Sequence, residues 1–135
     1  MTIRYAENTD YLWLKEHDKH ISNEVLKTKI GAREIYVVQE GSELTGWLRY
    51  NLFWDNIPFM NMVFLPEEYR HKGIGKKLVH HWEKDMREKG HKNVLTSTQS
   101  DEEAQHFYRK LGYTEIGGFS ISNEPTELIF CRNIG

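Results

Sequence analysis

A short run of basic residues and glycines is the segment of this sequence whose residue types and spacing are best suited to chemistry. The run reads Arg70-His71-Lys72-Gly73-Ile74-Gly75 and is followed by Lys76 and Lys77. An apolar, strand-like segment precedes it, and an amphipathic, helix-like segment follows it. A helix start presents unpaired backbone N–H groups and the positive end of the helix dipole, and phosphates bind there readily. Because glycines let the backbone approach an anion closely, the run predicts a local anion site.

Two common nucleotide-binding motifs fit this run less well. A dinucleotide fingerprint requires a third glycine at position 78, where the sequence has Leu78. A Walker loop requires a different glycine spacing before its lysine. The run by itself therefore leaves two alternatives open: a plain helix start with an incidental basic cluster, and a nucleotide-binding protein of another kind.

Composition narrows the class of protein. The 135 residues fit a single domain spanning 1–135, and their mixed charges, with a formal net charge of -2, give no overall attraction to nucleic acid or anionic membrane. The one cysteine, Cys131, lies in an apolar run and is expected to be a buried structural thiol. No apolar run approaches the roughly 20 residues of a membrane span, and the N-terminus lacks a signal-peptide pattern, so we expect a cytoplasmic protein.

Strand-like and helix-like patterns alternate along the chain and must position the basic run. Strands are expected at 3–6, 34–39, 44–54, 59–65, 93–98, 113–120 and 127–132. Helices are expected from Thr9 or Asp10 to about His20, from Ser22 to Gly31, over 74–90, and from a capping box at Ser100 to Gly112. This order predicts a mixed α/β sheet with helices on its faces.

Two segments resemble the signatures of the GNAT acetyltransferase superfamily. The stretch 65–78, which contains the basic run, is similar to the family's pyrophosphate-binding segment, Arg/Gln-x-x-Gly-x-Gly/Ala. The stretch Ala104-Gln105-His106-Phe107-Tyr108-Arg109-Lys110-Leu111-Gly112-Tyr113 resembles the second signature, Ala-x-x-Phe-Tyr-x-x-x-Gly-Phe/Tyr. The order of strands and helices also matches the family over nearly the whole chain.

The resemblance implies a mixed, mostly antiparallel central sheet of about seven strands, with helices on both faces, which splays between two parallel central strands, 59–65 and 93–98. It also implies acetyl-CoA as co-substrate in that cleft. The residues implied to bind acetyl-CoA are Phe64 and Leu65 through main-chain atoms, and Arg70, His71, Lys72, Gly73, Ile74, Gly75 and Lys76 around the pyrophosphate. Asp101, where the family often has Asn, is a further candidate for a cofactor contact.

The implied reaction is transfer of the acetyl group to a primary amine by direct attack in a ternary complex. Tyr108 would be the general acid for the departing thiolate, although its place on the inward helix stripe also fits a packing role. The strand 59–65 contains no acid, so either Asp55 in the preceding turn or a water molecule would serve as the base. Trp54, Asp55 and Asn61 are the acceptor-site candidates, Asn61 as a residue that could position a water.

Several points stay open in the sequence. The acceptor is a small-molecule amine, which we favour, or a protein amine, and the resemblance weighs toward a homodimer. The missing strand carboxylate leaves an alternative, a non-catalytic acyl-CoA-binding sensor module of the same fold. The aromatic residues Trp47, Tyr50, Phe53 and Trp54 fit either the sheet core or an acceptor pocket. The histidine pairs His17/His20 and His80-His81 lack the cysteine or carboxylate companions of a metal site, so no metal site is expected.

Overall fold

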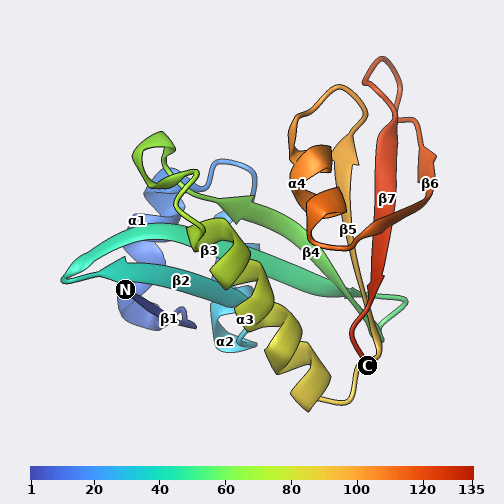
Figure 1. Cartoon of the computed structure of the whole chain (residues 1–135). Helices are drawn as coiled ribbons and strands as arrows, with labels where there is room; N and C mark the ends of the chain where they lie inside the picture. Colours follow the sequence, from blue (N-terminus) through green and yellow to red (C-terminus); the bar gives the residue numbers. More distant parts are fainter. The chain divides into compact units, whose positions relative to one another are not determined.

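The computed structural model describes residues 1–135, and its elements follow the expected order (Figure 1). The strands are β1 (Thr2–Tyr5), β2 (Ile35–Glu40), β3 (Glu43–Phe53), β4 (Ile57–Phe64), β5 (Asn93–Gln99), β6 (Thr114–Phe119) and β7 (Glu127–Asn133). The helices are α1 (Tyr11–His17), α2 (Asn23–Gly31), α3 (Ile74–Glu88) and α4 (Ala104–Lys110), with short 3-10 turns η1 (Asn8–Asp10) and η2 (Glu67–Tyr69). None of the helices is long and apolar enough to cross a membrane.

The strands form one seven-stranded mixed sheet in the order β1-β2-β3-β4-β5-β7-β6. The pairs β1–β2, β2–β3, β5–β7 and β6–β7 are antiparallel, and β4–β5 is parallel. The predicted sheet, with its parallel central pair, is therefore confirmed. The parallel register joins Phe59 to Leu95 and Met60 to Thr96.

The chain divides into two compact units. The first unit comprises Met1–Tyr50 and Met62–His81, and the second comprises Asn51–Asn61 and Trp82–Gly135. The strands β3 and β4 and the helix α3 each run from one unit into the other. The basic run lies in the first unit, and the helix that carries Tyr108 lies in the second.

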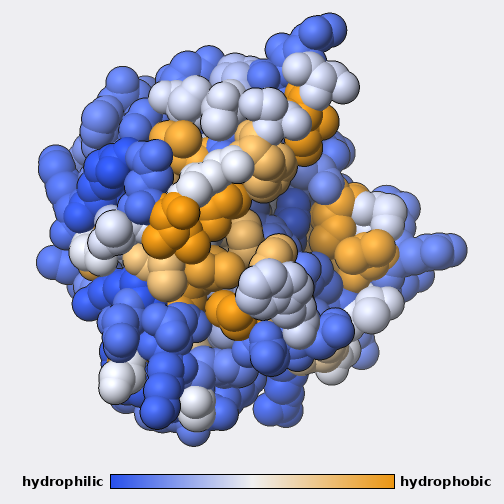
Figure 2. Space-filling model, turned by 90° about the vertical axis from the view of Figure 1, so that its right-hand side faces the viewer, coloured by the Kyte–Doolittle hydropathy of each residue, from blue (hydrophilic) through white to orange (hydrophobic).

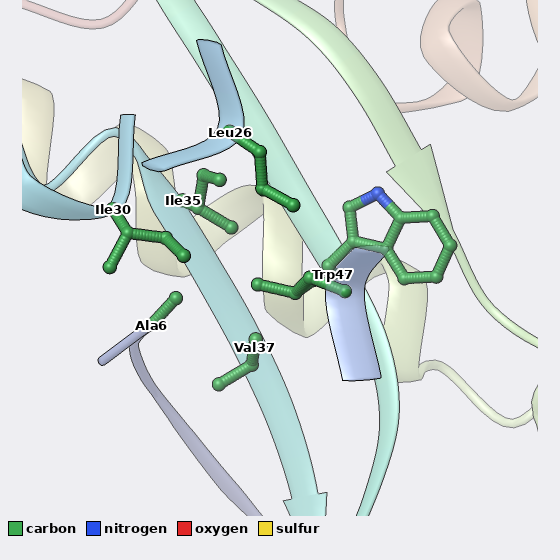
Figure 3. Packing of buried hydrophobic residues seen from close by; sticks show 7 residues of the cluster. Ala6, Leu26, Ile30, Ile35, Val37 and Trp47 are labelled. Atoms are coloured by element: carbon green, nitrogen blue, oxygen red, sulfur yellow. The ribbon is translucent and has the colours of Figure 1, made fainter. Parts of the chain in front are cut away.

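The core of the first unit forms between β2, β3 and the two N-terminal helices (Figure 3). Its buried members are Ala6, Leu14, Leu26, Ile30, Ile35, Val37 and Trp47. As expected, Ser22 caps α2, because its Oγ accepts a hydrogen bond from the Val25 N–H at 3.2 Å. This burial of apolar area supplies most of the driving force for folding here.

The helix α1 ends at His17, earlier than the predicted end near His20. Asp18 leaves the helix with an extended backbone (φ -91°, ψ 102°). Its buried carboxylate accepts a hydrogen bond from Arg49 Nε at 2.8 Å, and a carboxylate buried without that partner would be costly. A contact between residues far apart in sequence therefore decides where this helix stops.

The second unit is built on the long antiparallel β5–β7 ladder, with β6 on its outer edge (Figure 1). A buried polar network holds Tyr113, the residue before β6, together with the end of β7 and with α3. Tyr113 Oη donates to Glu83 Oε2 at 2.7 Å, and Arg132 Nη1 donates to Glu83 Oε1 at 2.6 Å. Because all three groups have partners, the Glu83 carboxylate can remain in a site where it is 1% exposed.

The predicted capping box at Ser100 is wrong, because α4 begins only at Ala104. The Ser100 N–H donates to the Thr126 carbonyl at 2.8 Å, which keeps Ser100 in the turn after β5. The residue at the N-cap position is Glu103, so Asp101 lies before the start of the helix. Asp101 is exposed in this turn.

Candidate active site

The basic run forms the connection between β4 and α3. After η2 the chain passes through His71 and Gly73, which have left-handed φ values of 62° and 79°. The first helical hydrogen bond from α3 back into the loop runs from the Lys77 N–H to the Gly73 carbonyl at 3.1 Å. The N–H groups of the first helical residues, Ile74 to Lys76, therefore precede the helical ladder and are available to an anion.

Gly73 is required by its backbone conformation rather than by crowding. A Cβ at this position would have nothing within 4 Å, but φ of 79° is a region that L side chains rarely adopt. The open space in front of Gly73 fits a site where an anion approaches the backbone closely. The side chains of His71, Lys72, Lys76 and Lys77 are exposed around it and add positive charge.

Arg70 ties the loop to the end of β4. Its Nε donates to the Leu65 carbonyl at 2.9 Å, and its guanidinium lies 6.0 Å from the centre of the Phe64 ring. The carbonyl of Leu65, one of the two predicted main-chain contributors, is therefore already engaged. The remaining guanidinium nitrogens carry further donors that suit a phosphate oxygen.

The end of β4 passes unusually close to β3 at Gly46. A Cβ on Gly46 would lie 2.7 Å from the Phe64 carbonyl oxygen and 2.6 Å from Leu65 Cδ2, so only glycine fits. On the other side Phe64 stacks on Trp47 with ring centroids 4.6 Å apart. These contacts hold the main chain of Phe64 and Leu65 in one position within the first unit.

Tyr108 lies on α4 in the second unit and is 7% exposed. Its ring meets Phe107 and Tyr113 edge-on, with centroids 5.3 and 5.7 Å away, and Phe130 lies at 6.5 Å. Burial raises the pKa of Tyr108 to about 12, helped by the charge of Glu102 and opposed by a hydrogen bond with Thr96. At neutral pH the phenol therefore keeps its proton and can donate a hydrogen bond.

Thr96 connects Tyr108 to the parallel pair of strands, and the sequence analysis did not identify it. Its Oγ1 donates to the Met60 carbonyl at 3.0 Å, at the second of the two parallel register pairs. Two residues further along β5, the hydroxyl of Thr98 is buried and has no hydrogen-bond partner. A signal was present in the sequence, since Thr96 and Thr98 are two residues apart in a predicted strand, a spacing that places them on one face.

The acceptor-site candidates lie at separate places in the second unit. Trp54 and Asp55 form the turn between β3 and β4 with φ of 55° and 63°, and both are exposed. Asn61 lies near the other end of β4, where its Nδ2 donates to Asn51 Oδ1 at 3.1 Å. The side chains of Asp55 and Asn61 therefore do not contact each other.

A pocket of about 600 Å³ lies within the second unit. Its lining is almost entirely apolar and consists of Phe53, Trp54, Ile57, Phe59, Asn93, Leu95, Ile116, Gly117, Phe119, Ile129 and Cys131. Hydrophobic side chains gather on the side of the molecule that faces the viewer in Figure 2. Trp47 and Tyr50 are core residues, 2% and 4% exposed, whereas Phe53 and Trp54 belong to the pocket.

Cys131 is half-buried and lines this pocket, rather than being fully buried as expected. Its partial burial raises the pKa of its thiol above the ordinary value. The thiolate is therefore disfavoured, which argues for an inert side chain in the pocket wall. The structure contains no cluster of three or more His, Cys, Asp or Glu side chains arranged to hold a metal ion.

Solved structures share this fold at low sequence identity. Ard1 from Thermoplasma volcanium is 17% identical, with a TM-score of 0.82 over 98% of this chain and 96% of that chain. The ribosomal-protein-S18-alanine N-acetyltransferase from Escherichia coli is 16% identical, with a TM-score of 0.79 over 98% and 93%. The protein yncA from Salmonella typhimurium, solved with its cofactor acetyl-CoA, is 16% identical, with a TM-score of 0.79 over 100% and 94%.

No curated protein matches the sequence significantly. A family model described as the Acetyltransferase (GNAT) family matches residues 2–113, a range that includes both the basic run and the helix of Tyr108. The chain therefore belongs to the GNAT acetyltransferase family.

Proposed function

We propose that this protein is an N-acetyltransferase that moves the acetyl group from acetyl-CoA to a primary amine. The observation that carries the proposal is the loop before α3, where left-handed His71 and Gly73 lead into free helical N–H groups. Membership of the GNAT family supports it, as does the acetyl-CoA bound to the similar yncA structure. We also propose that the whole chain, 1–135, acts as one domain.

The pyrophosphate of acetyl-CoA would bind the N–H groups of Gly73 to Lys76, with Lys72 and Arg70 supplying charge. The main chain of Phe64 and Leu65 would bind the pantetheine. The unpartnered buried hydroxyl of Thr98 supports a polar ligand near β5, because a buried polar group without a partner is costly. A contact from Asp101 stays a prediction.

In the reaction the amine nitrogen forms a bond to the acetyl carbon, and the carbon–sulfur bond breaks. The amine loses one proton and the departing thiolate of CoA gains one. A thiol has a pKa of about 8.5, well below the value of about 12 for Tyr108. We therefore assign Tyr108 a role as the acid that hydrogen-bonds to the departing sulfur, while the amine supplies the proton that CoA finally holds.

The base that accepts the amine proton is either water or Asp55. Asp55 is exposed and lies in the β3–β4 turn, whereas the parallel register of β4 reaches Met60, five residues further along the chain. We favour a small-molecule amine as acceptor. Action in the cytoplasm and a homodimeric state also stay predictions.

The proposal is tested by calorimetric titration with acetyl-CoA and by following CoA thiol release across a panel of amines. Arg70→Ala should weaken acetyl-CoA binding about tenfold, since it removes charge-assisted hydrogen bonds. Arg33→Ala, which removes an exposed arginine that lies over the Tyr5 ring outside the loop, is the matched control and should leave binding unchanged. Stabilisation of the fold by ATP or NAD but not by CoA would contradict the proposal.

A second candidate function is a non-catalytic acyl-CoA sensor. The observation that favours it is the composition of β4, which contains no acidic residue between Ile57 and Phe64. Tight acetyl-CoA binding with no thiol release for any amine would select this function over the enzyme.

A further inference from the structure

The apolar pocket occupies one face of the sheet in the second unit, and Tyr108 occupies the other. On β5, Asn93 and Leu95 line the pocket, whereas the next residue, Thr96, forms a hydrogen bond with Tyr108. On β7, Ile129 and Cys131 line the pocket, while Phe130 packs near the Tyr108 ring. Since successive side chains of a strand point to opposite faces, the pocket and Tyr108 lie on opposite sides of the same two strands.

The pocket face changes from apolar to polar along the strands. Phe59 on β4 and Leu95 on β5 are register partners and belong to the apolar part. Two residues further along these strands, about 7 Å away, alternation places Asn61 and Ser97 on the same face. The register then brings Glu127 of β7 opposite Gln99, at the same polar end.

This change of character coincides with the parallel pair that Tyr108 reaches. Met60 and Thr96 are register partners, and Thr96 bonds both to the Met60 carbonyl and to Tyr108 on the opposite face. The polar residues Asn61 and Ser97 directly follow this pair in the sequence. A molecule with its body in the pocket would therefore have its polar end beside the Met60–Thr96 pair. Tyr108 contacts this same pair from the opposite face of the sheet.

We propose that the pocket holds the body of the amine acceptor, and that the acceptor is a primary amine attached to a neutral aromatic or aliphatic group. The proposal rests on the acetyltransferase function proposed above and specifies its substrate class. The pocket lining contains no charged side chain, so a second charge on the substrate body would be buried without a partner. Its volume of about 600 Å³ lies within the range of ligand-binding pockets. The Glu127 carboxylate attracts the cationic amine to the polar end.

The turn that carries Trp54 supports a binding role for this pocket. Two consecutive residues other than glycine, Trp54 and Asp55, have left-handed φ values. The Asn56 N–H donates to the Phe53 carbonyl at 3.2 Å, so these φ values are those of a two-residue hairpin turn, in which a bulky Trp is uncommon. The turn places an indole that is 75% exposed on the pocket wall, with its ring 4.8 Å from that of Phe53.

The test compares phenethylamine and hexylamine with ethanolamine and putrescine as acceptors, at saturating acetyl-CoA. We expect kcat/KM about tenfold or more higher for the two amines with apolar bodies. Ile116→Asn places an amide on an exposed pocket-lining residue and should raise the KM for phenethylamine about tenfold, without changing the KM for acetyl-CoA. Ile121→Asn is the matched control, because Ile121 is similarly exposed (61% against 58% for Ile116) but does not line the pocket, and it should leave both values unchanged.

A second measurement separates this proposal from the proposed function. Phenethyl alcohol, which cannot be acetylated at nitrogen, should bind the wild-type protein in a calorimetric titration and bind Ile116→Asn about tenfold more weakly. That result would support the pocket as a binding site for an apolar ligand, even if acetyl-CoA failed to bind and the proposed function were contradicted. Equal kcat/KM for ethanolamine and phenethylamine would overturn the substrate class. If the protein is a dimer, and Ile116→Asn dissociates it without changing the KM for phenethylamine, the proposed substrate class would also be overturned. This face would then be the interface with a second copy of the chain.

Discussion

At the scale of single residues, Tyr108 is the group whose chemistry depends most on its surroundings. A free tyrosine already holds its proton at neutral pH, and burial against aromatic rings raises the pKa further, to about 12. Thr96 opposes part of this shift and at the same time links the phenol to the parallel strands. The structure therefore favours a neutral hydrogen-bond donor at this position over an ionised group.

We expect Tyr108→Phe to lower kcat about a hundredfold and to leave the dissociation constant of acetyl-CoA nearly unchanged, because only the hydroxyl is lost. Steady-state kinetics and calorimetric titration measure the two effects. Tyr113→Phe is the matched control, since Tyr113 is a second buried tyrosine of the same unit whose hydroxyl bonds to Glu83. The control should lose about 1 kcal/mol of stability and retain kcat. Unchanged kcat in Tyr108→Phe would remove the tyrosine from the mechanism.

At the scale of elements, the loop between β4 and α3 depends on backbone conformation more than on side chains. Gly73 has φ of 79° with open space where a Cβ would lie, and Gly41 in the β2–β3 turn has φ of 58° with equally open space. The two glycines therefore differ in location but not in the kind of strain that a substitution would introduce. Comparing the same substitution at Gly73 and at Gly41 therefore distinguishes a loss of stability from a loss of acetyl-CoA binding.

Both Gly73→Ala and Gly41→Ala should lower the free energy of unfolding by about 1 kcal/mol, since an alanine is strained at positive φ. Only Gly73→Ala should also weaken acetyl-CoA binding, because the added strain shifts the loop N–H groups. Chemical denaturation and calorimetric titration of the two variants measure these effects. Equal acetyl-CoA affinity in both variants would speak against the pyrophosphate position proposed here.

Element boundaries show where sequence patterns stop being sufficient. The helix α3 was predicted well, because five apolar residues at helical spacing need only local information. The ends of α1 and α4 were placed wrongly. Asp18 is drawn out of α1 by Arg49, 31 residues away, and Ser100 is held in a turn by Thr126. Such long-range partners cannot be read from a local pattern.

At the scale of the whole molecule, the two compact units share three continuous elements, β3, β4 and α3. Each unit also has an ion pair with a buried carboxylate: Asp18 with the buried Arg49 in the first, and Glu83 with the partly exposed Arg132 in the second. A strand or helix that belongs to both units cannot remain half folded at little cost, because its hydrogen-bond ladder is cooperative. The units are thus expected to unfold together.

We predict a single unfolding transition for the wild type and for both Asp18→Ala and Glu83→Ala. Asp18→Ala leaves the buried Arg49 without its carboxylate and should lower the free energy of unfolding by about 3 kcal/mol. Glu83→Ala leaves the Tyr113 hydroxyl and the partly exposed Arg132 without their partner and should lower it by a smaller amount, about 2 kcal/mol. Tryptophan fluorescence together with circular dichroism follows both units, since Trp13 and Trp47 lie in the first and Trp82 lies in the second. Two separate transitions in either variant would contradict this prediction.

The glycine loop, the order of strands and helices, and the membership of the family could all be inferred from the amino-acid sequence, because they depend on local spacing and on short motifs. The remaining properties follow from the folded chain. The tertiary structure set the pKa of Tyr108, it linked Thr96 to that phenol, and it placed Phe53 and Trp54, which the sequence left open between core and pocket, in the wall of a pocket. These properties arise from burial and from contacts between distant strands, which no stretch of neighbouring residues encodes.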